Sequence, residues 1–149
     1  MAEGTPGDRE SRGRAIVAEM LGPSFLESME KSRRTRTFGK TTPNSYSNVF
    51  ADYWDRGGIE RKMRSLVTMS FLIALRMPQE LKHHVRGALN NGCTVEEIDE
   101  VLAQAAPYCG FPAAAIARQA AEEALQDWKS EHGNGRVGTR AAADQSQDL

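Results

Sequence analysis

Residues 58–112 read GIERKMRSLVTMSFLIALRMPQELKHHVRGALNNGCTVEEIDEVLAQAAPYCGFP, and this stretch decides the fold. Its apolar residues recur every three or four positions, which is the spacing of one face of an α-helix. On a helix over residues 79–91, four apolar side chains share one stripe: Leu81, Val85, Ala88 and Leu89. His84 lies at the edge of this stripe. The pattern therefore directs a titratable ring toward the core of the protein.

The neighbours of His84 on this helix are polar or small. At about 100° per residue, Glu80 and Asn91 lie beside His84, and Gly87 leaves the space one turn further on unfilled. Such an arrangement can hold a small ligand. The alternative is a histidine at the edge of the core whose hydrogen bonding is satisfied by Glu80, four residues earlier.

The boundaries of the following helices are marked in the same stretch. Gly92 suits the left-handed position after a helix. Thr94 and Glu97 form a T-x-x-E capping box at the start of the next helix. Pro107 breaks the pattern of that helix near its end, and a last helix covers residues 112–128.

Helical periodicity also extends toward the N-terminus. It predicts a helix over residues 13–31 with a break at Gly22-Pro23, and another from Thr42-Pro43 to Gly57-Gly58. The helix expected over residues 59–75 is charged at first and then apolar on every side, as in a core or a subunit interface. We therefore predict an all-α protein of about six helices.

The expected domain covers residues 13–129. Residues 1–12 are polar and rich in turn formers, so we expect a flexible N-terminus. Residues 130–149 are poor in apolar side chains, which predicts a disordered tail. Residues 66–75, the longest apolar run, are far fewer than the roughly 20 residues that a membrane span needs, and no signal peptide is recognised. We expect a cytoplasmic protein without a membrane partner.

Charge and cysteine content restrict the function further. The net charge of −1 favours no nucleic-acid partner. A local basic run is either a solvated face or a guide for a carboxylate substrate, and it contains Lys31, Arg33, Arg34, Arg36 and Lys40. Cys93 and Cys109 show no CxxC spacing and no clustered histidine, so we predict neither a redox pair nor a metal site.

Four blocks along the chain resemble the carboxymuconolactone decarboxylase family of small all-helical enzymes. They are RSLVT at 64–68, HVRGALNNG at 84–92, TVEEIDEVLAQ at 94–104 and YCGFPAA at 108–114. The resemblance covers most of residues 54–124 and implies an alkylhydroperoxidase D-like helical bundle. It also implies a homotrimer, or a homohexamer built as a trimer of dimers. The apolar helix over residues 59–75 favours such an oligomer as well.

The related alkylhydroperoxidase D-like proteins have a Cys-x-x-Cys-x-x-x-His motif and a glutamate twelve residues before the first cysteine. Aligned on His84, those three redox positions hold Met77, Glu80 and Ser65 in this chain. A thiol peroxidase needs a thiolate beside a resolving thiol. Peroxide reduction, our second hypothesis, is therefore disfavoured, and a non-catalytic ligand-binding oligomer is the third.

The first hypothesis is a decarboxylase, or another lactone-processing enzyme, that needs neither a metal nor an organic cofactor. Its substrate would be a carboxylated lactone or an aromatic-derived acid. We assign His84 as the general acid or base and Glu80 as its orienting partner. Arg64 can bind the substrate carboxylate through two parallel hydrogen bonds; its alternative role is a structural salt bridge.

Four further residues are expected to bind the substrate: Trp54, Thr68, Phe71 and Tyr108. Thr68 and Phe71 share a helix face with Arg64. Tyr108 can instead be a buried tyrosine bonded to the backbone. The chain has Trp54-Asp55-Arg56-Gly57-Gly58-Ile59 where relatives acting on the protocatechuate-derived lactone commonly read W-x-R-P-G-L, which leaves the substrate open.

Overall fold

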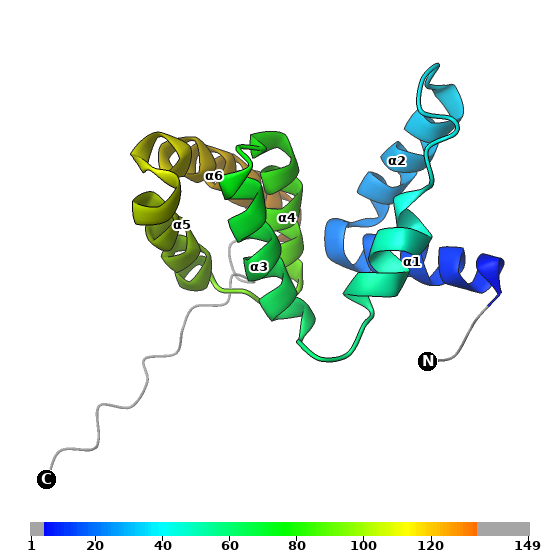
Figure 1. Cartoon of the computed structure of the whole chain (residues 1–149), viewed down its shortest axis with the longest axis horizontal. Coiled ribbons are helices and arrows are strands. Elements are labelled where there is room, and N and C mark those ends of the chain that lie inside the picture. The colour runs from blue at the N-terminus through cyan, green and yellow to red at the C-terminus, as the bar shows by residue number, and fades with distance from the viewer. Residues whose placement is uncertain (1–4, 134–149) are drawn as a thin grey trace, which may run out of the picture. The chain divides into compact units, whose positions relative to one another are not determined.

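A computed structural model describes residues 5–133, and the chain divides into two compact units, Met1–Arg64 and Ser65–Leu149. Every regular element in the described part is a helix, so the all-α prediction is confirmed (Figure 1). The first unit contains α1 (Pro6–Leu21), α2 (Pro23–Thr35) and the π-helix η1 (Tyr46–Trp54). Helix α3 (Arg61–Ala74) begins before the boundary, and the second unit continues with α4 (Pro78–Asn90), α5 (Val95–Cys109) and α6 (Phe111–His132).

Helix α1 begins at Pro6, earlier than residue 13, where we placed the helical domain. Thr5 caps it, because the Thr5 hydroxyl accepts from the backbone N–H of Asp8 and the Asp8 carboxylate accepts from the backbone N–H of Thr5. The break expected at Gly22-Pro23 is present. Gly22 has a φ of 93° there, and Pro23 opens α2.

The first unit packs α1 against η1. Its core cluster of large apolar side chains contains Ile16, Val17, Met20, Leu21, Tyr46, Phe50 and Trp54. The two helices meet at Gly13, where a Cβ atom would lie 1.9 Å from the carbonyl oxygen of Tyr46. Only glycine permits this approach. The helix that we predicted from Thr42-Pro43 is thus the shorter η1, which has the wider π-helical turn.

Helix α3 buries one face rather than its whole circumference. Ser65, Met69 and Ile73 are buried, whereas the exposed fractions of Phe71 and Leu75 are 62% and 69%. The apolar character predicted for this helix is therefore divided between the core of the second unit and an uncovered face.

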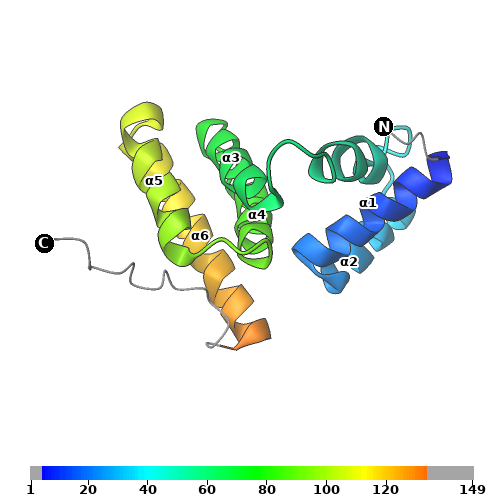
Figure 2. The same ribbon diagram turned by 90° about the horizontal axis from the view of Figure 1, so that it is seen from below.

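Helices α3 and α4 form an antiparallel hairpin. The chain turns at Arg76, which has a φ of 55°, and the Met77 N–H donates to the carbonyl of Leu72. The side chains of Ser65, early in α3, and Asn91, just after α4, are hydrogen-bonded, which requires the helices to run in opposite directions. Figure 2 shows α3 and α4 side by side from a second direction.

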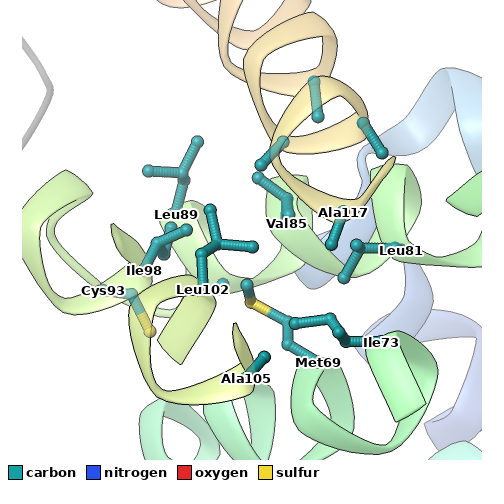
Figure 3. Close-up of a cluster of buried hydrophobic side chains, with 14 of the residues drawn as sticks. Met69, Ile73, Leu81, Val85, Leu89, Cys93, Ile98, Leu102, Ala105 and Ala117 are labelled. Atoms are coloured by element: carbon teal, nitrogen blue, oxygen red, sulfur yellow. The ribbon is translucent and has the colours of Figure 1, made fainter. Parts of the chain in front are cut away.

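The core of the second unit lies among α3, α4, α5 and α6. Figure 3 shows Met69 and Ile73 of α3 beside Leu81 of α4 and Leu102 of α5. The cluster also contains Val85, Ala88, Leu89, Cys93, Ile98, Ala105, Ala117, Ala120, Ala121, Ala124 and Trp128. The small residues of α6 allow α4 and α5 to approach it closely.

The helix boundaries near the C-terminus agree with most of the expected signals. Gly92 has a φ of 87°, and Thr94 and Glu97 form the predicted capping box. Pro107, however, lies inside α5 and does not end it. Helix α6 continues to His132, so residues 130–132 of the expected disordered tail are helical. The part of that tail from residue 134 onward lies outside the described residues. Among the described helices, none has the length and apolar content needed to cross a membrane.

Candidate active site

His84 is half-buried on α4, at the edge of the core cluster. Burial lowers the pKa of His84 below its ordinary value, and the nearby His83 acts in the same direction. The charge of Glu80 opposes this effect, as expected for a carboxylate one turn away, but it is the smaller influence. The ring is therefore biased toward its neutral form in the free protein.

Glu80 itself is exposed, in the first turn of α4. Its charge acts on His83 as well as on His84, and burial again lowers the pKa of His83 more than Glu80 raises it. Glu80 thus favours the charged form of both histidines. Burial has the larger effect on each pKa and favours the neutral form.

The half-buried Asn91, seven residues after His84 and so near the same side of an ideal helix, pairs with a serine of α3. Ser65 is fully buried on α3, and its Oγ accepts a hydrogen bond of 3.0 Å from Nδ2 of Asn91. This pairing was not predicted from the sequence, where Ser65 was considered only as the position of a redox glutamate. A serine at a core-facing position of an apolar helix was the available signal.

Arg64 is the last residue of the first unit, and its guanidinium is anchored there. One terminal nitrogen donates to the carbonyl oxygen of Arg56 at 2.6 Å and to that of Gly57 at 3.3 Å. Among residues 5–133 it forms no ion pair, so the structural salt bridge considered as an alternative is absent there. Its Nε is buried and has no hydrogen-bond acceptor within the same residues.

The four expected substrate-binding residues lie in different surroundings. Thr68 is half-buried on α3, while Phe71 is largely exposed on the same helix. Trp54 is only 6% exposed and belongs to the core of the first unit. Tyr108 is 80% exposed, so it is not the buried, backbone-bonded tyrosine considered as an alternative.

Tyr108 lines a surface groove of about 640 Å³ between α3 and α5. The groove is also lined by Leu66, Ser70, Glu97, Glu100, Val101, Gln104, Ala105 and Cys109. His84 and Glu80 are not among its lining residues. The structure therefore does not bring Tyr108 together with the proposed proton donor.

Side-chain bonds fix α4 against α6. The indole N–H of Trp128 donates to Oδ1 of Asn90 at 2.7 Å, and Arg86 pairs with Glu131 at 2.6 Å. Trp128 also stacks on His132, with 4.4 Å between the ring centroids. These bonds fix the C-terminal end of the helix that contains His84.

Comparison with known proteins gives the same family for most of this region. The model of the carboxymuconolactone decarboxylase family matches residues 47–123. Over 120 residues the chain is 34% identical to 4-carboxymuconolactone decarboxylase from Acinetobacter baylyi, covering 80% of this chain and 88% of the relative. The chain belongs to the carboxymuconolactone decarboxylase family.

A second relative has a different named substrate. Over 116 residues the chain is 42% identical to nitrosuccinic acid decarboxylase npaB from Metarhizium robertsii, covering 77% of this chain and 80% of that protein. Both relatives are decarboxylases by name, and this member of the carboxymuconolactone decarboxylase family is accordingly a carboxy-lyase.

The cysteines of this family member are separate. Cys93 is buried in the core of the second unit, Cys109 is half-buried at the end of α5, and no disulfide joins them. No group of three or more His, Cys, Asp or Glu residues in the described part of the chain could hold a metal ion. His84 is a titratable residue at the edge of the core, next to the half-buried His83.

Proposed function

We propose that this carboxy-lyase removes one carboxylate as CO2 from a small acid that contains its own electron-withdrawing group, with His84 as the proton donor. The half-buried His84 beside Gly87 is the observation that supports the proposal most directly. The relatives' named substrates, 4-carboxymuconolactone and nitrosuccinic acid, both suit this chemistry. A lactone carbonyl in conjugation, or a nitro group, can accept the electron pair of the breaking bond.

The reaction has two chemical events. The bond between the substrate carbon and its carboxylate breaks, CO2 leaves, and the electron pair moves into the carbonyl or nitro group. The carbon then takes a proton from the His84 imidazolium, and the neutral ring recovers a proton from solvent. Because the substrate accepts the electrons itself, the proposed reaction needs no metal or organic cofactor.

The low pKa of His84 in the free protein fits this scheme once a substrate binds. An anionic substrate beside the ring would raise the pKa of His84, as Glu80 already does to a smaller extent. The ring would then be protonated mainly in the complex. A ring that becomes protonated only beside its substrate is less able to lose that proton to solvent before the substrate carbon needs it.

Arg64 keeps its proposed role as the carboxylate anchor. Its buried Nε has no acceptor within residues 5–133, and a buried donor without an acceptor is costly unless a ligand supplies one. A substrate carboxylate is a suitable acceptor, because charge-assisted bonds to arginine are strong. Thr68, one turn further along α3, is the proposed polar neighbour of this carboxylate, and Phe71 an apolar one. Trp54 has a packing role in this proposal.

We also propose that the enzyme works in the cytoplasm as a homotrimer or homohexamer. The second unit leaves several large apolar side chains uncovered, among them Phe71, Leu75, Tyr108 and Phe111. Exposed apolar surface of this kind usually marks a protein interface. A second copy of the chain is the proposed occupant.

Replacement of His84 by glutamine tests the proposed function. We expect kcat for CO2 release from nitrosuccinic acid or 4-carboxymuconolactone to fall by about 10²-fold or more, the usual effect of losing a general acid. The matched control is His132→Gln, which changes a histidine that stacks on Trp128. Circular dichroism and thermal melting would establish that both variants fold.

Two results would refute the proposal. A His84→Gln enzyme with wild-type kcat would remove the proton donor from the mechanism. A wild-type enzyme that releases CO2 from neither acid would reject the substrate class.

A further inference from the structure

The Ser65–Asn91 pair is a polar exception in an apolar seam. Ser65 is fully buried, and its neighbours along the facing surfaces, Met69 of α3 and Ala88 of α4, are fully buried as well. Polar groups in such a position cost free energy relative to apolar ones unless they are hydrogen-bonded. The bond from Asn91 to Ser65 fixes the direction of the amide, and only part of the amide's bonding capacity is used in it.

Helical periodicity places His84 and Asn91 near the same side of α4. They are seven residues apart, which is within about 20° of two full turns and about 10 Å along the axis. Between them this side of the helix contains Gly87 and Ala88, which are both buried.

The opposite side of this interval is supplied by α3. Because the hairpin is antiparallel and Ser65 lies opposite Asn91, the next turn of α3 faces the preceding turn of α4. In these two turns, Met69, Gly87 and Ala88 are buried and Thr68 is half-buried. His84, Asn91 and Thr68 thus lie on the facing turns of one helical hairpin within the second unit.

We propose that Asn91 is a catalytic residue of this decarboxylase, and that Ser65 positions it. The inference rests on the proposed function. An asparagine amide has two N–H donors, and one of them is directed to Ser65. The second donates to the substrate oxygen that becomes negative as CO2 leaves, either the lactone carbonyl oxygen or a nitro oxygen.

The chemistry favours a neutral donor in this position. As the carbon–carboxylate bond breaks, the electron pair moves onto that oxygen, and a fixed N–H stabilises the new charge more than it stabilises the starting acid. His84 then protonates the carbon and the electron pair returns from the oxygen. A carboxylate at position 65, as in the alkylhydroperoxidase D-like motif, would repel this anion, whereas the serine hydroxyl is neutral.

Substitution of Asn91 tests the catalytic role. For Asn91→Ala we expect kcat to fall by about 10²-fold, the usual loss when one such donor is removed, with a smaller change in KM. Asn91→Asp keeps the shape but replaces the amide by an anion, so we expect a lower kcat together with a higher KM. Both would be measured as CO2 release from nitrosuccinic acid and 4-carboxymuconolactone.

The adjacent Asn90 provides the matched control. Its Oδ1 accepts from Trp128, so Asn90→Ala is expected to lower the melting temperature and leave kcat of the folded enzyme unchanged. An Asn91→Ala enzyme with wild-type kcat, beside an inactive His84→Gln enzyme, would overturn this inference and leave the proposed function intact. If both variants kept wild-type kcat, the proposed function would fail as well.

A double-mutant cycle tests the positioning role of Ser65. If Ser65 acts only by orienting Asn91, Ser65→Ala lowers kcat less than Asn91→Ala does, and the double variant is no slower than Asn91→Ala. Additive losses in kcat would overturn the positioning role. If the Asn91 variants did not fold, Ser65→Ala would decide: a lower kcat at an unchanged melting temperature supports the inference, and an unchanged kcat overturns it.

Discussion

Replacement of Trp128 by phenylalanine should destabilise the second unit measurably. Trp128 is 4% exposed, and its indole N–H donates to Oδ1 of Asn90 at 2.7 Å. Phenylalanine removes this donor but retains a ring that can stack on His132. Loss of a partner from a part-buried acceptor costs about 1–3 kcal/mol, and the smaller ring costs about 1–2 kcal/mol of buried apolar area. We expect the free energy of unfolding to fall by about 2–5 kcal/mol.

The assay is urea unfolding followed by far-UV circular dichroism, because the substitution removes one of the two tryptophans and so alters fluorescence. Measuring Trp128→Phe, Asn90→Ala and the double variant isolates the hydrogen bond, with an expected coupling of about 1 kcal/mol. An unfolding midpoint and slope equal to those of the wild type in Trp128→Phe would refute the reasoning. Additive single losses would show that the bond itself contributes nothing.

Three further predictions concern the ionisation, assembly and thiols of the enzyme. Burial lowers the pKa of His83 and His84. The contribution of these two histidines to stability is therefore present above about pH 6.5 and is lost as the pH falls through their folded-state pKa values. Melting temperatures should drop on acidification, and they should drop less in His84→Gln. Light scattering should give a mass several times 16.4 kDa, and Phe71→Glu should reduce it; a monomeric wild type would contradict the proposed oligomer. Replacing Cys93 and Cys109 together by serine should leave kcat nearly unchanged, whereas inactivity of the folded double variant would indicate thiol chemistry.

The parts of the fold that depend on local sequence could be predicted. The stripe containing Leu81 and Val85 follows from helical periodicity, and it correctly placed His84 at the edge of the core. The glycine after α4 and the capping box at Thr94 were predictable for the same reason, since each depends on residues within one turn.

The remaining features depend on contacts between distant segments. The spacing of apolar residues in η1 does not distinguish a π-helix from an α-helix, and the close approach of η1 to α1 at Gly13 joins segments 33 residues apart. The pairing of Ser65 with Asn91 joins positions 26 residues apart, and no periodicity reports it. The exposure of Tyr108 likewise depends on which neighbouring helix covers it.

The position of Gly13 has a consequence for how related sequences can vary. The family match begins at residue 47, within η1, so α1 lies outside the matched segment and is nevertheless packed against its first helix. That junction has no room for one additional methyl group, because a Cβ at Gly13 would meet the Tyr46 backbone. Homologues that retain glycine here are expected to retain this N-terminal helix in the same place. Homologues with any larger residue must attach a different extension to the shared enzyme.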